Sequence, residues 1–252
     1  MYRSAVGSKV RKRALWLASL TALGGLLWAN VRATPTRSEK RLAGYTTSLK
    51  GRKKAQIRNA ALAARALDGT VIGVGKEFSY NAVVSANDQE AGYVPAPVSV
   101  EGTMVPALGG GVCQTSTTLY NAALLAGLIV LERHPHTIAP KYVPPGRDAA
   151  VAWPGVDLRL KNPYPFVVRL RARVLGERLS VEVVGEKSLS QSIGLETRVL
   201  SVQEPARRSI LGRRRSSAGV AGLRVATYRS VAGRRERLSD DTYATLDEVV
   251  PD

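Results

Sequence analysis

The sequence predicts an α+β fold: a compact mixed domain with a cysteine at a helix N-terminus packed on antiparallel strands, plus a small C-terminal β appendage. A helix is predicted over Thr115–Leu128, because an apolar stripe recurs there at helical spacing and no proline interrupts it. Half-buried antiparallel strands are predicted over Asp157–Leu160, Phe166–Leu175 and Arg178–Val184, where apolar and charged residues alternate. Alternating runs return after Gly219 and indicate the appendage.

The elements that open the domain follow from the same patterns. Lys53–Leu67 is rich in alanine, with apolar residues three and four positions apart, so it predicts a helix that ends at Asp68-Gly69. Thr70–Tyr80 and Pro97–Val105 are predicted as strands, since glycine and proline separate them from their neighbours. Glu101-Gly102 is expected to be a hairpin turn.

The N-terminal segment predicts export. The basic cluster Arg11-Lys12-Arg13 precedes an uncharged, largely apolar run from Ala14 to Asn30, as in a signal peptide or signal-anchor helix. Small residues in Val31-Arg32-Ala33 suit a cleavage site, so a cleaved leader and a retained anchor both stay open. We expect residues 1–33 to direct the chain out of the cytoplasm, leaving it secreted or anchored by one helix.

Changes in composition predict the remaining boundaries. Residues 34–52 are basic and poor in large apolar side chains, which is typical of a tether. Residues 53–187 form the main domain with its helical lead-in. Across residues 188–217 the alternation decays and arginines cluster, which predicts a basic linker, and residues 218–252 form the β appendage.

The charge balance restricts the partners. The chain of 252 residues carries 37 Lys and Arg against 20 Asp and Glu, a formal charge of +17. This excess favours anionic partners. Because an exported domain does not meet the nucleic acids of the cell, we expect the basic tethers to contact an anionic membrane surface or wall polymers, and no nucleic acid.

The segment with the clearest chemistry is Leu108–Leu128. Its cysteine, Cys113, is the single cysteine of the chain, so it forms no internal disulfide. Three glycines precede it and let another chain approach closely, and the predicted helix begins around it. The free N–H groups and partial positive charge of a helix N-terminus stabilise a thiolate. The N–H groups of Cys113, Gln114 or Thr115 could also stabilise an oxyanion.

A nucleophilic cysteine needs a base, and the chain contains two histidines, His134 and His136. Either imidazole could serve, and a carboxylate should orient it. Asp148 is preferred over Asp157, because glycine and proline constrain its loop. One cysteine and two histidines could instead bind zinc. We expect no metal and no cofactor, because Pro135 separates the histidines and no pattern of supporting residues accompanies them.

Six ordered blocks between about Gly75 and Glu186 resemble the VanW-domain family. They are Gly75–Asn81, Gly109–Gln114, Ser116–Ala123, Glu132–His136, Tyr142–Ala149 and Asp157–Asn162. Thr137 stands where the family usually has serine, and Thr115 lies at a tolerant position. The larger domains that precede this one in long family members are replaced by the short helical lead-in.

The resemblance implies an L,D-transpeptidase of peptidoglycan in which Cys113 attacks a stem tetrapeptide and a second stem resolves the thioester into a 3-3 cross-link. It implies His136 as the preferred base and His134 as the second choice, with Asp148 as the orienting carboxylate. The surface that binds substrate and oxyanion is expected to comprise residues around the nucleophile: Gly110, Gly111, Gln114, Thr115 and Ser116.

Three alternatives stay open at this point. A cysteine peptidase or amidase of wall peptides would use the same groups, with water in place of the amine. A non-catalytic module that binds peptidoglycan or glycopeptide-related targets would not need the thiol. A redox or zinc role would make the thiol depend on a partner or a metal.

Overall fold

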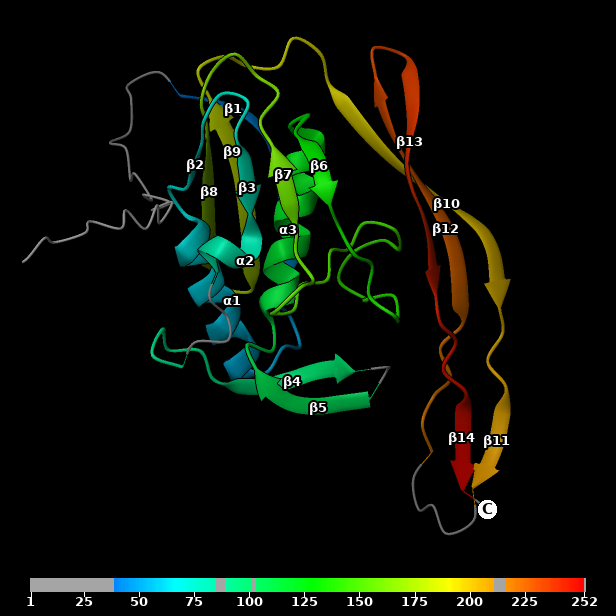
Figure 1. The fold of residues 1–252 in the computed structure, drawn as a ribbon. Coiled ribbons are helices and arrows are strands. Elements are labelled where there is room, and N and C mark those ends of the chain that lie inside the picture. Colours follow the sequence, from blue (N-terminus) through cyan, green and yellow to red (C-terminus); the bar gives the residue numbers. More distant parts are fainter. Residues whose placement is uncertain (1–38, 85–88, 101–102, 211–215, 252) are drawn as a thin grey trace, which may run out of the picture.

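A computed structural model describes residues 39–84, 89–100, 103–210 and 216–251, and it confirms the α+β class (Figure 1). The centre is a four-stranded antiparallel sheet in the order β1-β9-β8-β2. Its strands are β1 (Lys40–Ser48), β2 (Val71–Ile72), β8 (Val168–Leu175) and β9 (Arg178–Gly185). Helices α1 (Lys54–Leu67) and α3 (Val112–Leu125) pack against this sheet.

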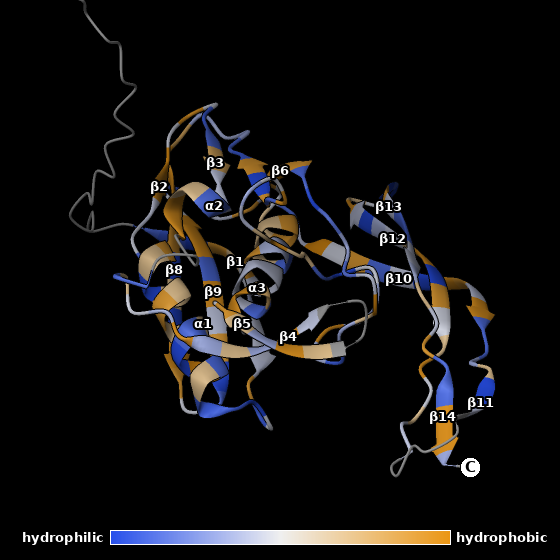
Figure 2. Ribbon diagram, turned by 60° about the horizontal axis from the view of Figure 1, so that its bottom comes forward, coloured by the Kyte–Doolittle hydropathy of each residue, from blue (hydrophilic) through white to orange (hydrophobic). Residues whose placement is uncertain are grey.

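The core lies between the two helices and the sheet. Its fully buried side chains include Leu67 of α1, Leu119 and Leu124 of α3, and Leu170 and Val181 of the sheet. Figure 2 shows hydrophilic and hydrophobic stretches alternating along α1, as expected for a helix with one buried face. Burial of each leucine contributes about 1.5–3 kcal/mol, so this contact fixes where the N-terminus of α3 lies.

Two smaller sheets flank the core. One has the order β3-β7-β6 and contains β3 (Glu77–Ser79), β6 (Ile129–Glu132) and β7 (Arg159–Lys161). The other is the antiparallel hairpin of β4 (Pro95–Val100) and β5 (Thr103–Leu108). This hairpin agrees with the expectation for Pro97–Val105, although its turn, residues 101–102, lies outside the described residues.

The C-terminal strands form a long twisted ribbon beside the main body (Figure 1). In it β12 (Gly222–Val231) pairs antiparallel with β10 (Ile193–Gln203) and β13 (Arg234–Tyr243). At the far end β11 (Arg207–Ile210) and β14 (Glu248–Pro251) form a short parallel pair.

Two helix boundaries differ from the sequence expectations. α3 begins at Val112 and ends at Leu125, three residues before Leu128, because Gly127 takes a positive φ of 73°. There the N–H groups of Gly127 and Leu128 donate to the carbonyls of Leu124 and Ala123, which is a Schellman cap.

The single strand expected over Thr70–Tyr80 is divided into β2 and β3, because Gly75 turns the chain with a φ of 66°. Tyr80 then opens the short helix α2 (Tyr80–Val83), whose first turn is capped by the Ser79 hydroxyl.

Two segments expected as tether and linker contain strands. Residues 40–48, within the expected tether, form β1 and pair with β9 along its whole length. Residues 193–203, within the expected linker, form the 11-residue strand β10. Both β1 and β10 are edge strands, and each is stabilised by hydrogen bonds to a partner strand that is distant in the sequence. The second half of β10 is exposed on both faces, so the sequence there lacks a clear alternation of apolar and polar residues.

The expected N-terminal signal or anchor, residues 1–33, lies outside the described residues. Within the described ranges, no helix is both long and apolar enough to cross a membrane.

Candidate functional site

Close backbone packing positions the N-terminus of α3. A Cβ added at Gly110 would lie 2.5 Å from the carbonyl oxygen of Ala96, and one added at Gly111 would lie 2.5 Å from that of Gln56. Gly111 also has a φ of 106°, which favours glycine. The chains that approach these glycines are therefore β4 and α1 of the protein itself, and their contact fixes the first turn that carries Cys113.

Cys113 lies in this first turn and is half-buried. Its Sγ lies 3.3 Å from the carbonyl oxygen of Val151, and the thiol also hydrogen-bonds to the His136 ring. Burial by itself raises the pKa of the thiol, but the hydrogen bond and charge of His136 outweigh it and hold the pKa below its usual value. The neighbouring His136 therefore shifts Cys113 toward the thiolate form.

His136 lies between the thiol and a carboxylate. Its Nδ1 is 2.6 Å from Oδ2 of Asp148, and its backbone N–H donates to the same oxygen at 2.7 Å. Burial by itself lowers the pKa of His136, but the hydrogen bonds to Asp148 and Cys113 raise it to about 9. The charged form of the imidazole is therefore favoured at neutral pH.

Asp148 is fully buried and satisfied on both oxygens. While Oδ2 binds His136, Oδ1 accepts from the Tyr243 hydroxyl at 2.5 Å and from Arg133 at 3.1 Å. Burial raises the pKa of this carboxyl, but the hydrogen bond to His136 and the charge of Arg133 hold it below its usual value. Cys113, His136 and Asp148 therefore form a continuous chain of contacts, the arrangement that activates a cysteine nucleophile.

The other two acid–base candidates, His134 and Asp157, lie outside this series of contacts. The side chain of His134 is 45% exposed, and its Nε2 lies 3.0 Å from Glu132. Asp157 accepts hydrogen bonds from Ser79 and from the backbone of Asn81, so it holds the start of α2.

The polar side chains that follow Cys113 are engaged within the fold. Gln114 accepts from Arg52 and donates to the Ser48 carbonyl. The Thr115 hydroxyl lies 3.4 Å from the carbonyl of Ala60 in α1.

The Ser116 hydroxyl likewise faces two backbone carbonyls, those of Cys113 at 3.0 Å and Ala149 at 2.7 Å. These side chains fix the helix against its neighbours.

Unlike these side chains, the backbone N–H of Cys113 has no hydrogen-bond partner among the described residues.

Several residues around the site were not among the site residues expected from the sequence. Arg133 joins Asp148 to Asp241, and Tyr243 reaches Asp148 from a strand of the appendage. Tyr142 donates to the Cys113 carbonyl at 3.4 Å, and burial raises the pKa of its hydroxyl, so it stays a donor beside the nucleophile. Arg133 could have been found through its place next to the histidines, whereas nothing local marks Tyr243.

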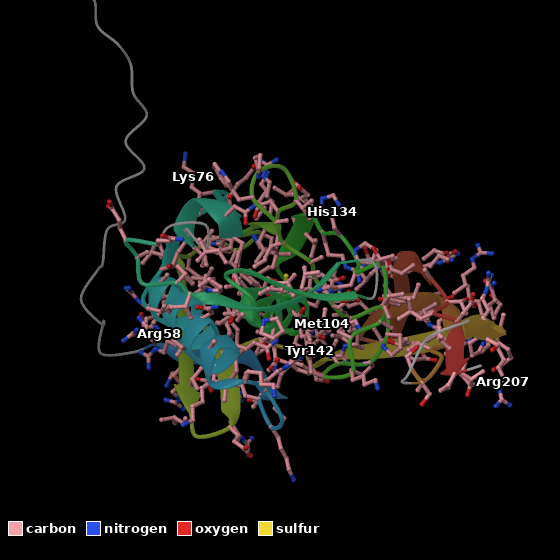
Figure 3. The ribbon with its side chains drawn as sticks, turned by 90° about the horizontal axis from the view of Figure 1, so that it is seen from below. Arg58, Lys76, Met104, His134, Tyr142 and Arg207 are labelled. Carbon is pink, nitrogen blue, oxygen red and sulfur yellow. The ribbon has the colours of Figure 1, made fainter. Side chains whose placement is uncertain are left out.

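The site lies in the main body of the molecule. Figure 3 shows Tyr142, Met104 and His134 there, with Arg207 at the far end of the ribbon. Within the described ranges, no three His, Cys, Asp or Glu side chains are grouped as metal ligands would be.

Comparison with known proteins supports the resemblance seen in the sequence. The family described as VanW like protein matches residues 55–184, just over half of the chain. The uncharacterized protein YoaR of Bacillus subtilis is 40% identical over 139 residues, which are 55% of this chain and 46% of that protein. The vancomycin B-type resistance protein VanW of Enterococcus faecalis is 26% identical over 137 residues, 52% of this chain and 50% of that protein.

The chain spans about half the length of these two curated relatives, and no solved structure matches it. The matched range includes Cys113, His136 and Asp148. On this match the chain belongs to the VanW-like protein family.

Proposed function

We propose that this protein is an extracytoplasmic cysteine L,D-transpeptidase that acts on peptidoglycan stem peptides. The observation that carries the proposal is the chain of contacts from the Cys113 thiol through His136 to the buried Asp148, at the N-terminus of α3. A thiolate beside a charged imidazole is the resting state of a cysteine nucleophile, and an acyl transfer needs no further group from a cofactor.

In the first half-reaction, the Cys113 thiolate attacks the carbonyl carbon between the third and fourth residues of a tetrapeptide stem. The carbon–nitrogen bond breaks, and the His136 imidazolium gives its proton to the leaving amine of D-Ala. A thioester on Cys113 remains. In the second half-reaction, a side-chain amine of another stem attacks the thioester and passes a proton to His136, which regenerates the thiolate and leaves a 3-3 cross-link.

The oxyanion of each tetrahedral intermediate forms next to the first turn of α3. The backbone N–H of Cys113 is free among the described residues, and it lies where the helix N-terminus has a partial positive charge. We assign it as one oxyanion donor. Removing one such donor typically costs about 10²–10³ in rate, so this amide is worth a substantial part of the acceleration.

The expected export of the chain supports the choice of substrate. The basic, apolar-cored N-terminus fits an exported chain that is secreted or held by one helix, and the charge of +17 fits attraction to anionic lipid or wall polymers. The enterococcal relative is named a vancomycin B-type resistance protein, which also favours a role in the cell envelope.

The test is mass spectrometry of the full chain incubated with tetrapeptide-stem muropeptides. We expect an acyl adduct on Cys113 and 3-3 dimers with the wild type, and neither with Cys113→Ala or His136→Gln. His134→Gln is the matched control, because its ring contacts Glu132 outside the chain of contacts, and it should keep both products.

The other outcomes separate the alternatives. Cut stems without dimers would identify a cysteine peptidase and refute the transpeptidase. Equal binding of the peptide by wild type and Cys113→Ala, with no adduct and no product, would identify a non-catalytic binding module.

A further inference from the structure

The C-terminal ribbon closes over the loop that carries Asp148. Tyr243, at the end of β13, is 2% exposed, and its hydroxyl donates to Asp148 and accepts from the backbone N–H of Gly146 at 2.6 Å. The buried Thr227 of β12 donates to the Gly146 carbonyl at 3.0 Å. Just after β13, the N–H of Ala244 donates to the carbonyl of Thr137 at 2.7 Å. Both sides of the loop between the histidines and Asp148 are therefore held by the hairpin β12–β13.

A second contact from β13 passes through Arg133. The side chain of Arg133 is 6% exposed, and its guanidinium bridges Asp148, at 3.1 Å, and Asp241 of β13, at 2.5 Å. Asp241 is itself held by the Ser239 hydroxyl at 2.8 Å. A buried cation between two buried carboxylates has a fixed position, because leaving any of the three unpaired in the interior is strongly unfavourable.

These contacts bear directly on the geometry of the nucleophile. Oδ2 of Asp148 orients the His136 ring, and the position of Oδ2 depends on what holds Oδ1. The two donors to Oδ1 are Tyr243 itself and Arg133, which Asp241 fixes. Both appendage residues lie beyond residues 55–184, the range that the family match covers.

We propose that the hairpin β12–β13 is a working part of the site, with Tyr243 and Asp241 as positioning residues that fix Asp148 and, through it, His136. This inference deepens the proposed function and rests on it only in taking Cys113, His136 and Asp148 to act as one unit. It gives the appendage a definite role, since the carboxylate that orients the base is completed by strands remote from it in the chain.

The ionisable groups that face this cluster come from four parts of the fold. Those of α2, α3, the segment 133–148 and β13 are Tyr80, Cys113, Tyr120, Arg133, His136, Tyr142, Arg147, Asp148, Asp241 and Tyr243. Burial raises the pKa of the four tyrosines, so they stay neutral across the pH range of the test below.

The test uses the reactivity of the thiol in the full-length chain. Because Cys113 is the single cysteine, the rate of alkylation by iodoacetamide between pH 5 and pH 9 reports on this site alone. In Tyr243→Phe we expect the midpoint of the pH profile to rise by about one unit, which is roughly a tenfold slower alkylation below the midpoint. Tyr228→Phe is the matched control, since Tyr228 lies on the same hairpin and packs under Arg235 instead. It should leave the profile unchanged.

The profile separates positioning from simple stabilisation. A folded Tyr243→Phe chain with the wild-type midpoint would overturn the inference, even if its urea midpoint had fallen. If Tyr243→Phe does not fold, Asp241→Asn, which keeps the shape of the side chain, is tested in the same way, and an unchanged profile there overturns the inference equally. Alkylation needs no muropeptide, so a failure of the transpeptidase assay with a shifted profile refutes the proposed function and leaves the positioning role intact.

Discussion

A measurement of the pKa of His136 tests the electrostatics of the site most directly. Burial lowers the pKa of His136, but the hydrogen bond to Asp148 and then that to Cys113 outweigh it and raise the pKa from 6.5 to about 9. A rise of this size corresponds to a preference for the charged ring on the order of 3 kcal/mol. Asp148→Asn removes the carboxylate, so we expect the pKa of His136 to fall in that variant.

Nuclear magnetic resonance of the imidazole signals measures this pKa. The chain contains 2 histidines, and His134→Gln leaves the signals of His136 alone. We expect a midpoint close to 9 in that chain and a clearly lower one when Asp148→Asn is added. A midpoint at or below 6.5 with Asp148 intact would refute the thiolate–imidazolium pair and the reasoning built on it.

The same shift has a consequence for stability. A histidine whose pKa is raised on folding stabilises the fold fully below its unfolded pKa, and this contribution is lost as the pH rises through the folded value. The free energy of unfolding should therefore fall between about pH 6.5 and pH 9 by up to roughly 3 kcal/mol. The thiol of Cys113 has a lowered pKa and acts in the opposite sense, so the fall is best measured by urea denaturation in Cys113→Ala. There His136 keeps Asp148 and a smaller version of the effect remains.

Two further predictions concern residues that position the site. Gly111→Ala should lower the free energy of unfolding by ~3 kcal/mol or more, because the new Cβ meets the Gln56 carbonyl at 2.5 Å. The control Gly176→Ala is also at positive φ but in open space, so it should lower the free energy of unfolding by only about 1 kcal/mol. Equal losses in urea denaturation would contradict the packing argument. Arg133→Met should destabilise the fold by about 3–5 kcal/mol, since it leaves two buried carboxylates without their cation, and the exposed Arg224→Met is the control expected to change little. Wild-type stability of Arg133→Met would mean that this bridge does not hold β13 to the main body.

The main elements and the nucleophile were predictable because their signals are local. The stripe of α3, the alternation of β8 and β9 and the glycines before Cys113 each lie within one short stretch, and the structure places the helix and strands there. The sequence also identified Asp148 as the preferred carboxylate, and the structure brings it to His136. Which imidazole would face the thiol was open, because alternate residues of an extended segment point in opposite directions.

The parts that were not predicted depend on partners distant in the chain. β1 and β10 are edge strands stabilised by pairing, and neither has a sequence pattern of its own that distinguishes it from a basic tether or linker. The contact between Tyr243 and Asp148 joins residues 95 positions apart. A buried tyrosine near the end of a strand is typical of core packing, so local reasoning had no basis for assigning it to the site.

The burial of Asp148 explains why the appendage and the site belong together. A carboxylate with no exposure must receive hydrogen bonds on both oxygens, because an unpaired buried charge is more costly than the gain from any one contact. His136 satisfies one oxygen, and the segment that carries both residues supplies only Arg133 for the other. The remaining donor to Asp148 is Tyr243, and Asp241 is the second carboxylate that pairs with Arg133. Strand β13 therefore supplies contacts around Asp148 that the main domain does not provide. The thiol must be accessible to substrate, and Cys113 is half-buried. The carboxylate that orients the imidazole must keep a fixed position, and Asp148 is fully buried.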